Sequence, residues 1–493
     1  MPEVRIVDTT IRDGQASLWA MNMRTRHMLP IMPHLDAAGF DSMEFLATGS
    51  RLKKFVRHLE ENPWDWIRQG AAAAKHTQLR WHGPIDGRSM SGRVPPEVGE
   101  LLVSKAVELG IDLTRTGNNW NDFSDMPRQL ARFERLGMRA VINVMYSVSP
   151  RHTDEYFVEK TRQIAALRPY RLCFKDVGGL LTPERTRTLF PKMMAVSGDL
   201  EWEFHAHCNN GLGPLNAIEA AKAGAKYIHT AVPPLANGNS QPSVFNVVAN
   251  LRELGFDVPL DVERLAPVTQ HLEHVADVEG FAKGVPYEYS ERQYRHQIPG
   301  GMISSLEYQM KQAGVDGHME AVFEETERVR ADLGYPIMVT PLSQFVATQA
   351  AINVITGERY RQITDQVIEY ALGWHGGQEA LDAMDDDIRD MILERPRAKE
   401  IAAQDKEPPT LKELRKKYGP IPDEDLILRA IVGDDAVDVV GSADEPRAHL
   451  SSDRPLIQLL DELINRDRHR SVSIRRPGLS LTIERSEGAP VPR

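Results

Sequence analysis

Short apolar runs alternate with amphipathic stretches over the first 255 residues of the chain. Helical periodicity marks the stretches between the runs, as in Pro96–Leu109 and Asp154–Leu167. Eight strand–helix units in this length predict an α/β fold, a (β/α)8 TIM barrel, with a doubly wound open sheet as the alternative. The predicted strands are Val4–Asp8, Ser42–Ala47, Gln78–His82, Asp112–Thr116, Ala140–Tyr146, Arg171–Asp176, Glu201–His207 and Tyr227–Val232.

The pattern changes after residue 255, where strand-like runs end and long helical patterns continue to residue 395. We therefore expect a barrel domain over residues 1–255 and a mainly helical domain over 256–395, packed on the barrel mouth. Residues 396–412 are charged and contain proline, which is typical of a linker. Residues 413–493 form a small C-terminal extension, with short strands predicted at Ser471–Arg475 and Leu479–Ile483.

Composition narrows the class of protein. The chain has 41% hydrophobic and 26% charged residues, as in soluble globular proteins, and no apolar run of roughly 20 residues that could span a membrane. The N-terminus enters a strand pattern at once, without the apolar stretch of a signal peptide, so we expect a cytoplasmic protein. Two cysteines exclude a disulfide framework, and a net charge of −11 argues against a nucleic-acid partner.

Polar residues stand where several predicted strands end. Asp13 follows the first strand, Lys175 ends the sixth, and His205 and His207 end the seventh. Catalytic groups of a barrel come from these strand ends, and residues two apart on a strand face the same side. Imidazole and carboxylate ligands suit a divalent metal such as zinc, manganese or cobalt. The sequence therefore predicts a metal site formed by Asp13, His205 and His207.

Two residues near the predicted metal site, Lys175 and Cys208, each have more than one interpretation. An ammonium group cannot ligate a metal, so Lys175 either pairs with Asp176 or becomes a carboxylate ligand through carbamylation. Cys208, next to the histidine pair, is an additional ligand, a nucleophile or a small packing residue.

Six segments, in this order, resemble the carboxyltransferase domain of pyruvate carboxylase: DTTIRDGQAS, ENPWDWI, FKDVGGLLTPE, FHAHCNNGLG, NSQPS and RHQIPGGM. They are more similar still to the oxaloacetate decarboxylase alpha subunit and the matching transcarboxylase subunit. The resemblance covers residues 1–395 and continues weakly through KKYGPIPDEDLILR. The RDG turn also resembles the wider superfamily of metal-dependent barrels, which includes isopropylmalate synthase and HMG-CoA lyase.

The resemblance implies carboxyl transfer between biotin and an enolisable small-molecule acceptor, with the metal as Lewis acid. It implies catalytic roles for Arg12, Asp13 and Lys175, and metal ligation by Asp13, His205, His207 and carbamylated Lys175. It further implies that the helical domain completes the active site and accepts the biotin arm, and that the protein is a homodimer.

The departures from the family pattern concentrate around the acceptor. The family turn R-D-A-H-Q-S appears here with Ala16 in place of its glutamine, and Gln15 one residue earlier. The family arginine after the third strand has two candidates, Arg80 and Arg88. We therefore expect an acceptor other than simple pyruvate. The candidate substrate-binding residues are Gln15, Arg88, Asn121 and Cys208.

The biotin half of the site also differs. The family places a proton-shuttling threonine before I-P-G-G, whereas here no threonine occurs between Thr269 and Thr326. Tyr287, Tyr289 and Ser290 are the candidates to replace it. The chain lacks the Ala-Met-Lys-Met hairpin of a biotin carrier, so biotin is expected on a separate subunit.

Biotin carboxylase and biotin carrier subunits are therefore the expected partners, with the tail Ser471–Ile483 as a candidate docking element. The alternative function is a biotin-independent metal-dependent lyase, aldolase or decarboxylase on the same barrel. A non-catalytic scaffold subunit is a third interpretation, against which the intact metal set weighs.

Overall fold

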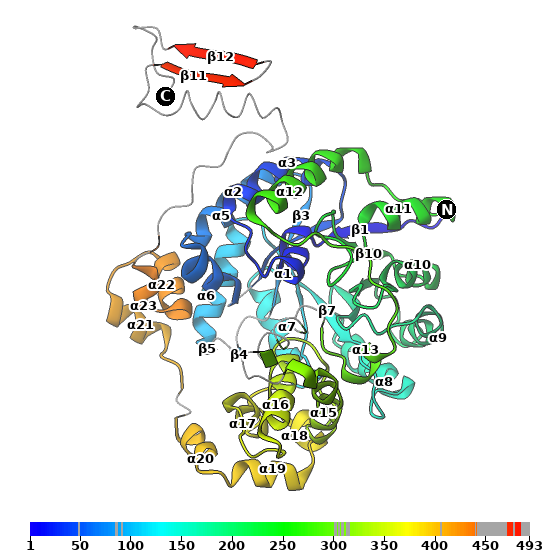
Figure 1. Ribbon diagram of the computed structural model, residues 1–493, viewed down its shortest axis with the longest axis vertical. Coiled ribbons are helices and arrows are strands. Elements are labelled where there is room, and N and C mark those ends of the chain that lie inside the picture. The colour runs from blue at the N-terminus through cyan, green and yellow to red at the C-terminus, as the bar shows by residue number, and fades with distance from the viewer. Residues whose placement is uncertain are drawn as a thin grey trace.

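Eight parallel strands close into a barrel at the centre of the molecule (Figure 1). The structure is a computed structural model that describes residues 1–47, 50–83, 87–89, 92–299, 303, 306, 310–311, 316–404, 407–438, 440, 471–476 and 479–484. The ring order is β1-β10-β9-β8-β7-β6-β3-β2, with β1 and β2 adjacent where the ring closes. The barrel strands are β1 (Arg5–Asp8), β2 (Ser42–Ala47), β3 (Gln78–His82), β6 (Leu113–Thr116), β7 (Arg139–Met145), β8 (Arg171–Asp176), β9 (Trp202–Ala206) and β10 (Tyr227–Thr230). All eight predicted strands, and the barrel itself, are confirmed.

Helices surround the barrel because each amphipathic segment buries its apolar face against the strands. Phe174 of β8 stacks on Phe190 of α9 at 5.3 Å between ring centroids and meets Phe204 of β9 edge-on at 6.2 Å. The outer helices are α3 (Met32–Ala37), α5 (Pro63–Ala73), α6 (Pro96–Glu108), α7 (Met126–Arg135), α8 (Asp154–Ala165), α9 (Pro183–Met194), α10 (Gly213–Ala223) and α11 (Val244–Glu253). Shorter helices at the barrel are α1 (Gln15–Leu18), α2 (Thr25–Met28) and α4 (Ser50–Lys54), and a small hairpin pairs β4 (Gly87–Ser89) with β5 (Gly92–Val94).

The helical domain has an apolar cluster of its own, separate from that of the barrel. Trp120, from the loop after β6, is the barrel's contribution to this cluster, and its ring lies 6.1 Å from that of Tyr370. Arg151 and Lys160 of the barrel both pair with Glu379 of the domain. The helices of the domain are α13 (Arg292–His296), α15 (Met319–Asp332), α16 (Leu342–Thr356), α17 (Asp365–Ala371), α18 (Gly377–Ala383), α19 (Asp386–Leu393) and α20 (Pro396–Ala403).

Two segments differ from the domain limits expected from sequence. Helix α12 (Ala266–Glu279), expected in the helical domain, packs on the barrel, because Val268 and Leu272 join the barrel's apolar cluster. Helix α20 occupies the first half of the expected linker, because Ala398 and Ile401 give it an apolar side that is buried in the helical domain. Proline at the start of a helix is tolerated, so the proline content of this segment did not exclude α20.

The chain then returns to the barrel. Leu414 of α21 (Leu411–Tyr418) and Leu426 of α22 (Asp423–Val432) are buried in the barrel's apolar cluster, and the short α23 (Asp434–Val437) follows. An antiparallel hairpin of β11 (Ser471–Arg476) and β12 (Leu479–Glu484) forms where two short strands were predicted. Among the described helices, none has the length and apolarity needed to cross a bilayer.

Candidate metal centre

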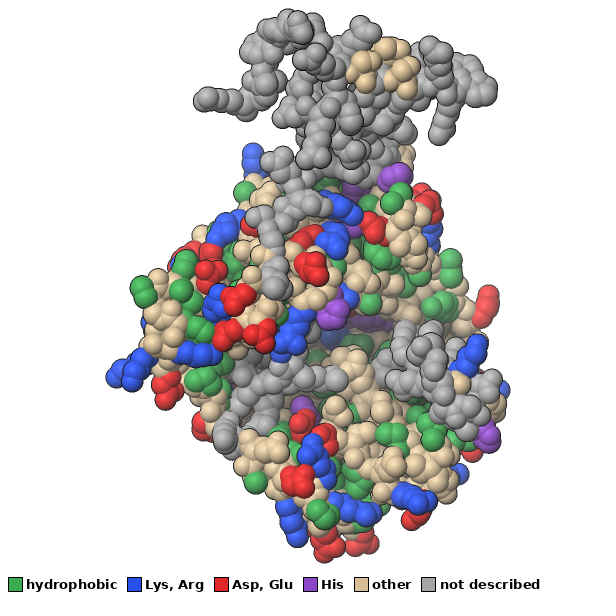
Figure 2. Space-filling model, turned by 60° about the vertical axis from the view of Figure 1, so that its left-hand side comes forward, with side chains coloured by type: hydrophobic (Ala, Val, Ile, Leu, Met, Phe, Trp, Pro, Cys, Tyr) green, Lys and Arg blue, Asp and Glu red, His purple; other side chains and the backbone are tan. Residues whose placement is uncertain are grey.

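Asp13, His205 and His207 converge at the barrel mouth as the sequence predicted. The Nε2 atoms of His205 and His207 lie 3.2 and 3.7 Å from Oδ2 of Asp13. All three side chains are buried, and their candidate ligand atoms lie within 4.8 Å of one another. Histidine side chains also show in the hollow between the barrel and the helical domain (Figure 2).

Local geometry brings Asp13 to this point. A single π-helical turn, Thr10–Gly14, follows β1 and turns the Asp13 side chain toward the histidines. Gly14 allows the turn to approach the loop after β10, because an added Cβ would lie only 3.0 Å from the carbonyl oxygen of Leu235. The two histidines come from the end of β9, one in the strand and one directly after it.

The arrangement of acceptors indicates a cation. Nδ1 of His207 lies 2.7 Å from the carbonyl oxygen of Asn239, which can only accept, so the ring nitrogen Nδ1 carries the hydrogen. Nε2 of His207 therefore presents a lone pair toward the Asp13 carboxylate. Burial alone would raise the pKa of Asp13, but the positive charge of Arg12 helps to hold it well below its usual value. Nitrogen and oxygen lone pairs that face one another fit a divalent metal ion.

Lys175 lies beside this group. It is the residue before the last in β8, pairs in register with His205 of β9, and is 5% exposed. Burial, together with the positive charge of Arg115, lowers the pKa of the Lys175 amine to about 7. Asp176, the alternative partner of Lys175, instead accepts hydrogen bonds from the backbone N–H groups of Leu180 and Leu181, at 3.0 and 2.7 Å.

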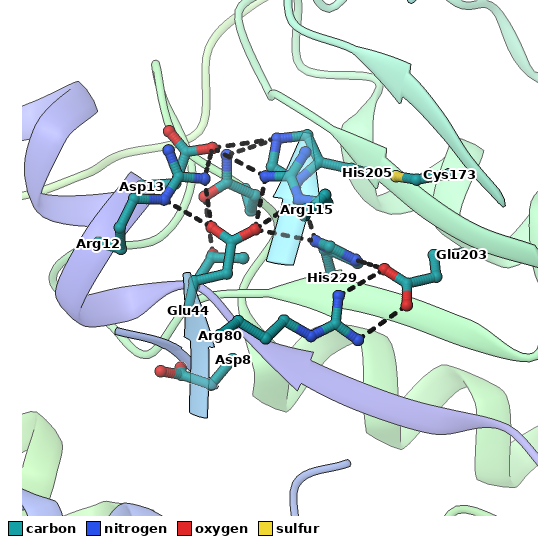
Figure 3. A network of polar contacts seen from close by, with 12 residues as sticks. Asp8, Arg12, Asp13, Glu44, Arg80, Arg115, Cys173, Glu203, His205 and His229 are labelled. Atoms are coloured by element: carbon teal, nitrogen blue, oxygen red, sulfur yellow. Dashed lines mark hydrogen bonds and ion pairs between the residues drawn. The ribbon is translucent and has the colours of Figure 1, made fainter. Parts of the chain in front are cut away.

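Two arginines share one buried glutamate next to the metal centre. Nε of Arg12 and Nε of Arg115 donate to opposite oxygens of Glu44, at 2.8 and 2.7 Å. Nη2 of Arg12 also donates to Oδ2 of Asp13, at 2.8 Å (Figure 3). This network fixes the Asp13 carboxylate and places two positive charges beside it.

Two of the predicted substrate-binding residues, Gln15 and Asn121, have their amides occupied by contacts within the protein. Gln15 is fully buried and bound to the Ile11 carbonyl oxygen, the Met23 N–H and Arg51. Both polar groups of the Asn121 amide pair with the Met145 backbone, at 2.8 and 2.9 Å.

These contacts of Gln15 and Asn121 hold the surrounding loops in place. Cys208 packs against helix α10, where an added Cβ at Gly213 would lie 2.5 Å from its Sγ. Burial raises the pKa of Cys208, which disfavours the nucleophile interpretation. The side chain of Arg88 lies outside the described residues, as does Gly300–Met302 of the IPGGM segment.

The three biotin-pocket candidates lie on a segment that crosses the loops after β9 and β10. The Ser290 N–H donates to Oδ1 of Asn210 at 2.6 Å, and the Tyr287 backbone and side chain pass close to Gly211 and Gly238. The Tyr287 and Tyr289 side chains are 39% and 53% exposed. Both residues are therefore accessible, and Tyr287 lies beside the loop whose Asn239 contacts His207.

Several polar residues of the site were not singled out from sequence. Nε2 of the Gln241 amide lies 3.0 Å from Nε2 of His207 and 3.4 Å from that of His205. His82, at the end of β3, has a buried Nδ1 without a hydrogen-bond partner in the described structure. The feature of the sequence that could have identified most of them is a polar residue inside a strand that is otherwise apolar. The strand residues concerned are Glu44, His82, Arg115, Glu203 and His229, whereas Gln241 lies in the loop after β10.

Comparison with protein families gives two matches. Residues 102–272 match the HMGL-like family, and residues 294–454 match the conserved carboxylase domain. A pyruvate carboxylase subunit of Methanocaldococcus jannaschii is 36% identical over 376 residues, which are 76% of this chain and 66% of that protein. The 2-oxoglutarate carboxylase large subunit of Hydrogenobacter thermophilus is 32% identical over 380 residues, 76% of this chain and 57% of that one.

The fold has close counterparts among solved structures. The carboxyltransferase domain of Rhizobium etli pyruvate carboxylase has a TM-score of 0.76 at 22% identity, over 89% of this chain and 77% of that one. The chain spans somewhat less than two thirds of the length of the first curated relatives. From these matches and the barrel geometry, the chain belongs to the family of carboxyltransferase domains and subunits of biotin-dependent carboxylases.

Proposed function

We propose that this chain is the carboxyltransferase component of a multisubunit biotin-dependent carboxylase, and that Asp13, His205, His207 and carbamylated Lys175 bind its metal. The observation that carries the metal site is the convergence of Asp13, His205 and His207, with their acceptor atoms facing one another. We assign Lys175 as the fourth ligand because it pairs in backbone register with His205 and because burial lowers the pKa of its amine. The Lys175 nitrogen attacks the carbon of CO2 and releases one proton, which yields a carboxylate.

The chain's own residues then prepare carboxyl transfer. When bound, the metal ion supplies Lewis acidity that polarises an oxygen of the acceptor. Arg12 and Arg115 add positive charge beside the metal centre, where negative charge grows as an acceptor enolises. The exposed Tyr287 and Tyr289 flank the loops after β9 and β10, where we place the biotin arm.

The acceptor is the part that we expect to differ from simple pyruvate. Gln15 and Asn121 use their amides for loop contacts, and Nδ1 of His82, at the end of β3, has no hydrogen-bond partner among the described residues. Two of the relatives are named for different oxo acids, pyruvate and 2-oxoglutarate. We propose an oxo acid as the acceptor class, with biotin carboxylase and carrier subunits as partners.

Gentle purification of the native protein, followed by a streptavidin blot and metal analysis, tests this function. We expect a biotinylated partner at fixed stoichiometry and about one divalent ion per chain. With carboxylated carrier, Asp13→Asn should reduce carboxyl transfer to oxo acids by at least ~100-fold, while the exposed Asp125→Asn leaves it unchanged. Bound metal without any biotinylated partner would favour the biotin-independent lyase, aldolase or decarboxylase. The match of residues 102–272 to the HMGL-like family supports that second candidate.

A further inference from the structure

A chain of buried polar side chains runs from His205 into the barrel, away from the metal centre. Nδ1 of His205 lies 3.0 Å from Nδ1 of His229 in β10, and Nε2 of His229 lies 2.9 Å from Oε2 of Glu203 in β9. Glu203 is also bound by both terminal nitrogens of Arg80, at 2.6 and 2.8 Å (Figure 3). All four side chains are at most 1% exposed.

The direction of each hydrogen bond follows from the end of this chain. Glu203 receives N–H groups from Arg80 and from Arg171, which bind it as a carboxylate. A carboxylate only accepts, so Nε2 of His229 carries the hydrogen between them. Nδ1 of a neutral His229 ring is then an acceptor, and the hydrogen in its contact with His205 belongs to Nδ1 of His205.

The position of this hydrogen determines what His205 presents to the metal centre. A neutral His205 with its hydrogen on Nδ1 has a lone pair on Nε2, the atom that lies 3.2 Å from Asp13. His207 is held in the same tautomer by the backbone carbonyl oxygen of Asn239. His205 has no such carbonyl partner among the described contacts and depends on His229 instead.

We propose that Glu203 and His229 are positioning residues that fix the tautomer and orientation of His205 for metal binding. This inference rests on the proposed metal site. It extends that site to residues that touch neither the metal nor the acceptor. Outer partners of metal-binding histidines commonly change metal affinity by about 10- to 100-fold.

Cobalt titration of the purified chain tests the proposal without any activity assay. His229→Phe keeps a ring in the space and leaves Glu203 paired with Arg80 and Arg171, while Glu203→Gln lets an amide N–H face His229. We expect both variants to bind Co²⁺ about 10- to 100-fold more weakly than the wild type. The control is Asp41→Asn, which removes a charge that binds the same two arginines but leaves His229 untouched, and should stay within about twofold.

A spectroscopic readout separates this role from general loosening of the barrel. In the cobalt-loaded wild type, the Nδ1 hydrogens of His205 and His207 should each give a shifted, slowly exchanging proton resonance. His229→Phe should lose or broaden the His205 resonance and keep that of His207. If His229→Phe keeps the wild-type cobalt affinity and both resonances, the proposed positioning role is wrong, but the proposed metal site is unaffected. If the wild type binds no cobalt, both the positioning role and the proposed metal site are wrong.

Discussion

Lys175 combines deep burial with a position next to His205 of the proposed metal site. Only 5% of the residue is exposed, and burial together with Arg115 lowers the pKa of its amine to about 7. Near neutral pH, a large fraction of the molecules thus carry Lys175 as the uncharged amine, which is the form that reacts with CO2. The same burial that would make a lysine ammonium costly therefore favours its conversion to a carboxylate ligand.

This argument predicts a labelled carbamate. Protein equilibrated with ¹³C-bicarbonate should show a carbamate carbon resonance that Lys175→Ala abolishes. The same variant should bind metal at least ~10-fold more weakly and lose any gain in metal affinity on adding bicarbonate. Lys160→Ala is the matched control, since that lysine pairs with Glu379 at the domain interface. An unchanged resonance in Lys175→Ala would place the carbamate elsewhere.

His152 gives a pH dependence that is independent of the metal centre. Burial, with Arg330 and Arg151 nearby, lowers its pKa from 6.5 to about 3. The unfolded chain therefore binds a proton below pH 6.5 that the folded chain takes up only near pH 3. Stability from this residue is fully present above pH 6.5 and is lost as pH falls, by about 1.4 kcal/mol per pH unit.

The measurement compares thermal midpoints at pH 7 and pH 5. The wild type should lose more on acidification than His152→Asn, whose amide keeps a partner for Ser149 but does not titrate. The exposed His58→Asn should behave as the wild type. Equal acid sensitivity of wild type and His152→Asn would contradict the assignment.

At the scale of elements, the barrel strands could be predicted because an apolar run between two amphipathic stretches has few other structures available. The convergence of Asp13, His205 and His207 could be predicted because strand ends of a barrel share one face. The charged layer inside the barrel could not, since Arg115 meets Glu44, and Arg80 meets Glu203, only when distant strands close the ring. Nothing in the local sequence of one strand indicates which charge another strand supplies.

The contacts between the two domains also join residues that are far apart in the sequence. Trp120 lies in a loop after β6 but is buried in the apolar cluster of the helical domain. Arg330 of α15 reaches back and donates to the Val148 carbonyl oxygen and the Ser147 hydroxyl, both at 2.9 Å. These contacts attach the helical domain to the loops after β6 and β7, on the rim where the metal centre lies. The sequence pattern predicted the packing of this domain on the mouth, but not the residues that carry it.

At the scale of the whole molecule, the C-terminal extension has two parts with different attachments. Helices α21 and α22 complete the barrel's outer layer, since Leu414, Leu426 and Ile427 are buried in its apolar cluster. The β11–β12 hairpin pairs with no other strand of the described structure. A two-stranded hairpin is at best marginally stable alone, and no other described strand pairs with either of its outer edges.

We therefore propose that the hairpin is a docking element for a partner subunit, which pairs with or covers one of its edges. A chain truncated after Val440 keeps α21 and α22, so its thermal midpoint and cobalt affinity should equal those of the full-length protein. Association with the biotinylated partner, measured by co-purification, should fall at least ~10-fold, because the edge that the partner completes is gone. Truncation within α22 is the contrasting variant and should destabilise the barrel itself, since it removes buried leucine and isoleucine side chains. Unchanged partner binding after truncation at Val440 would assign the docking surface to the barrel or the helical domain instead.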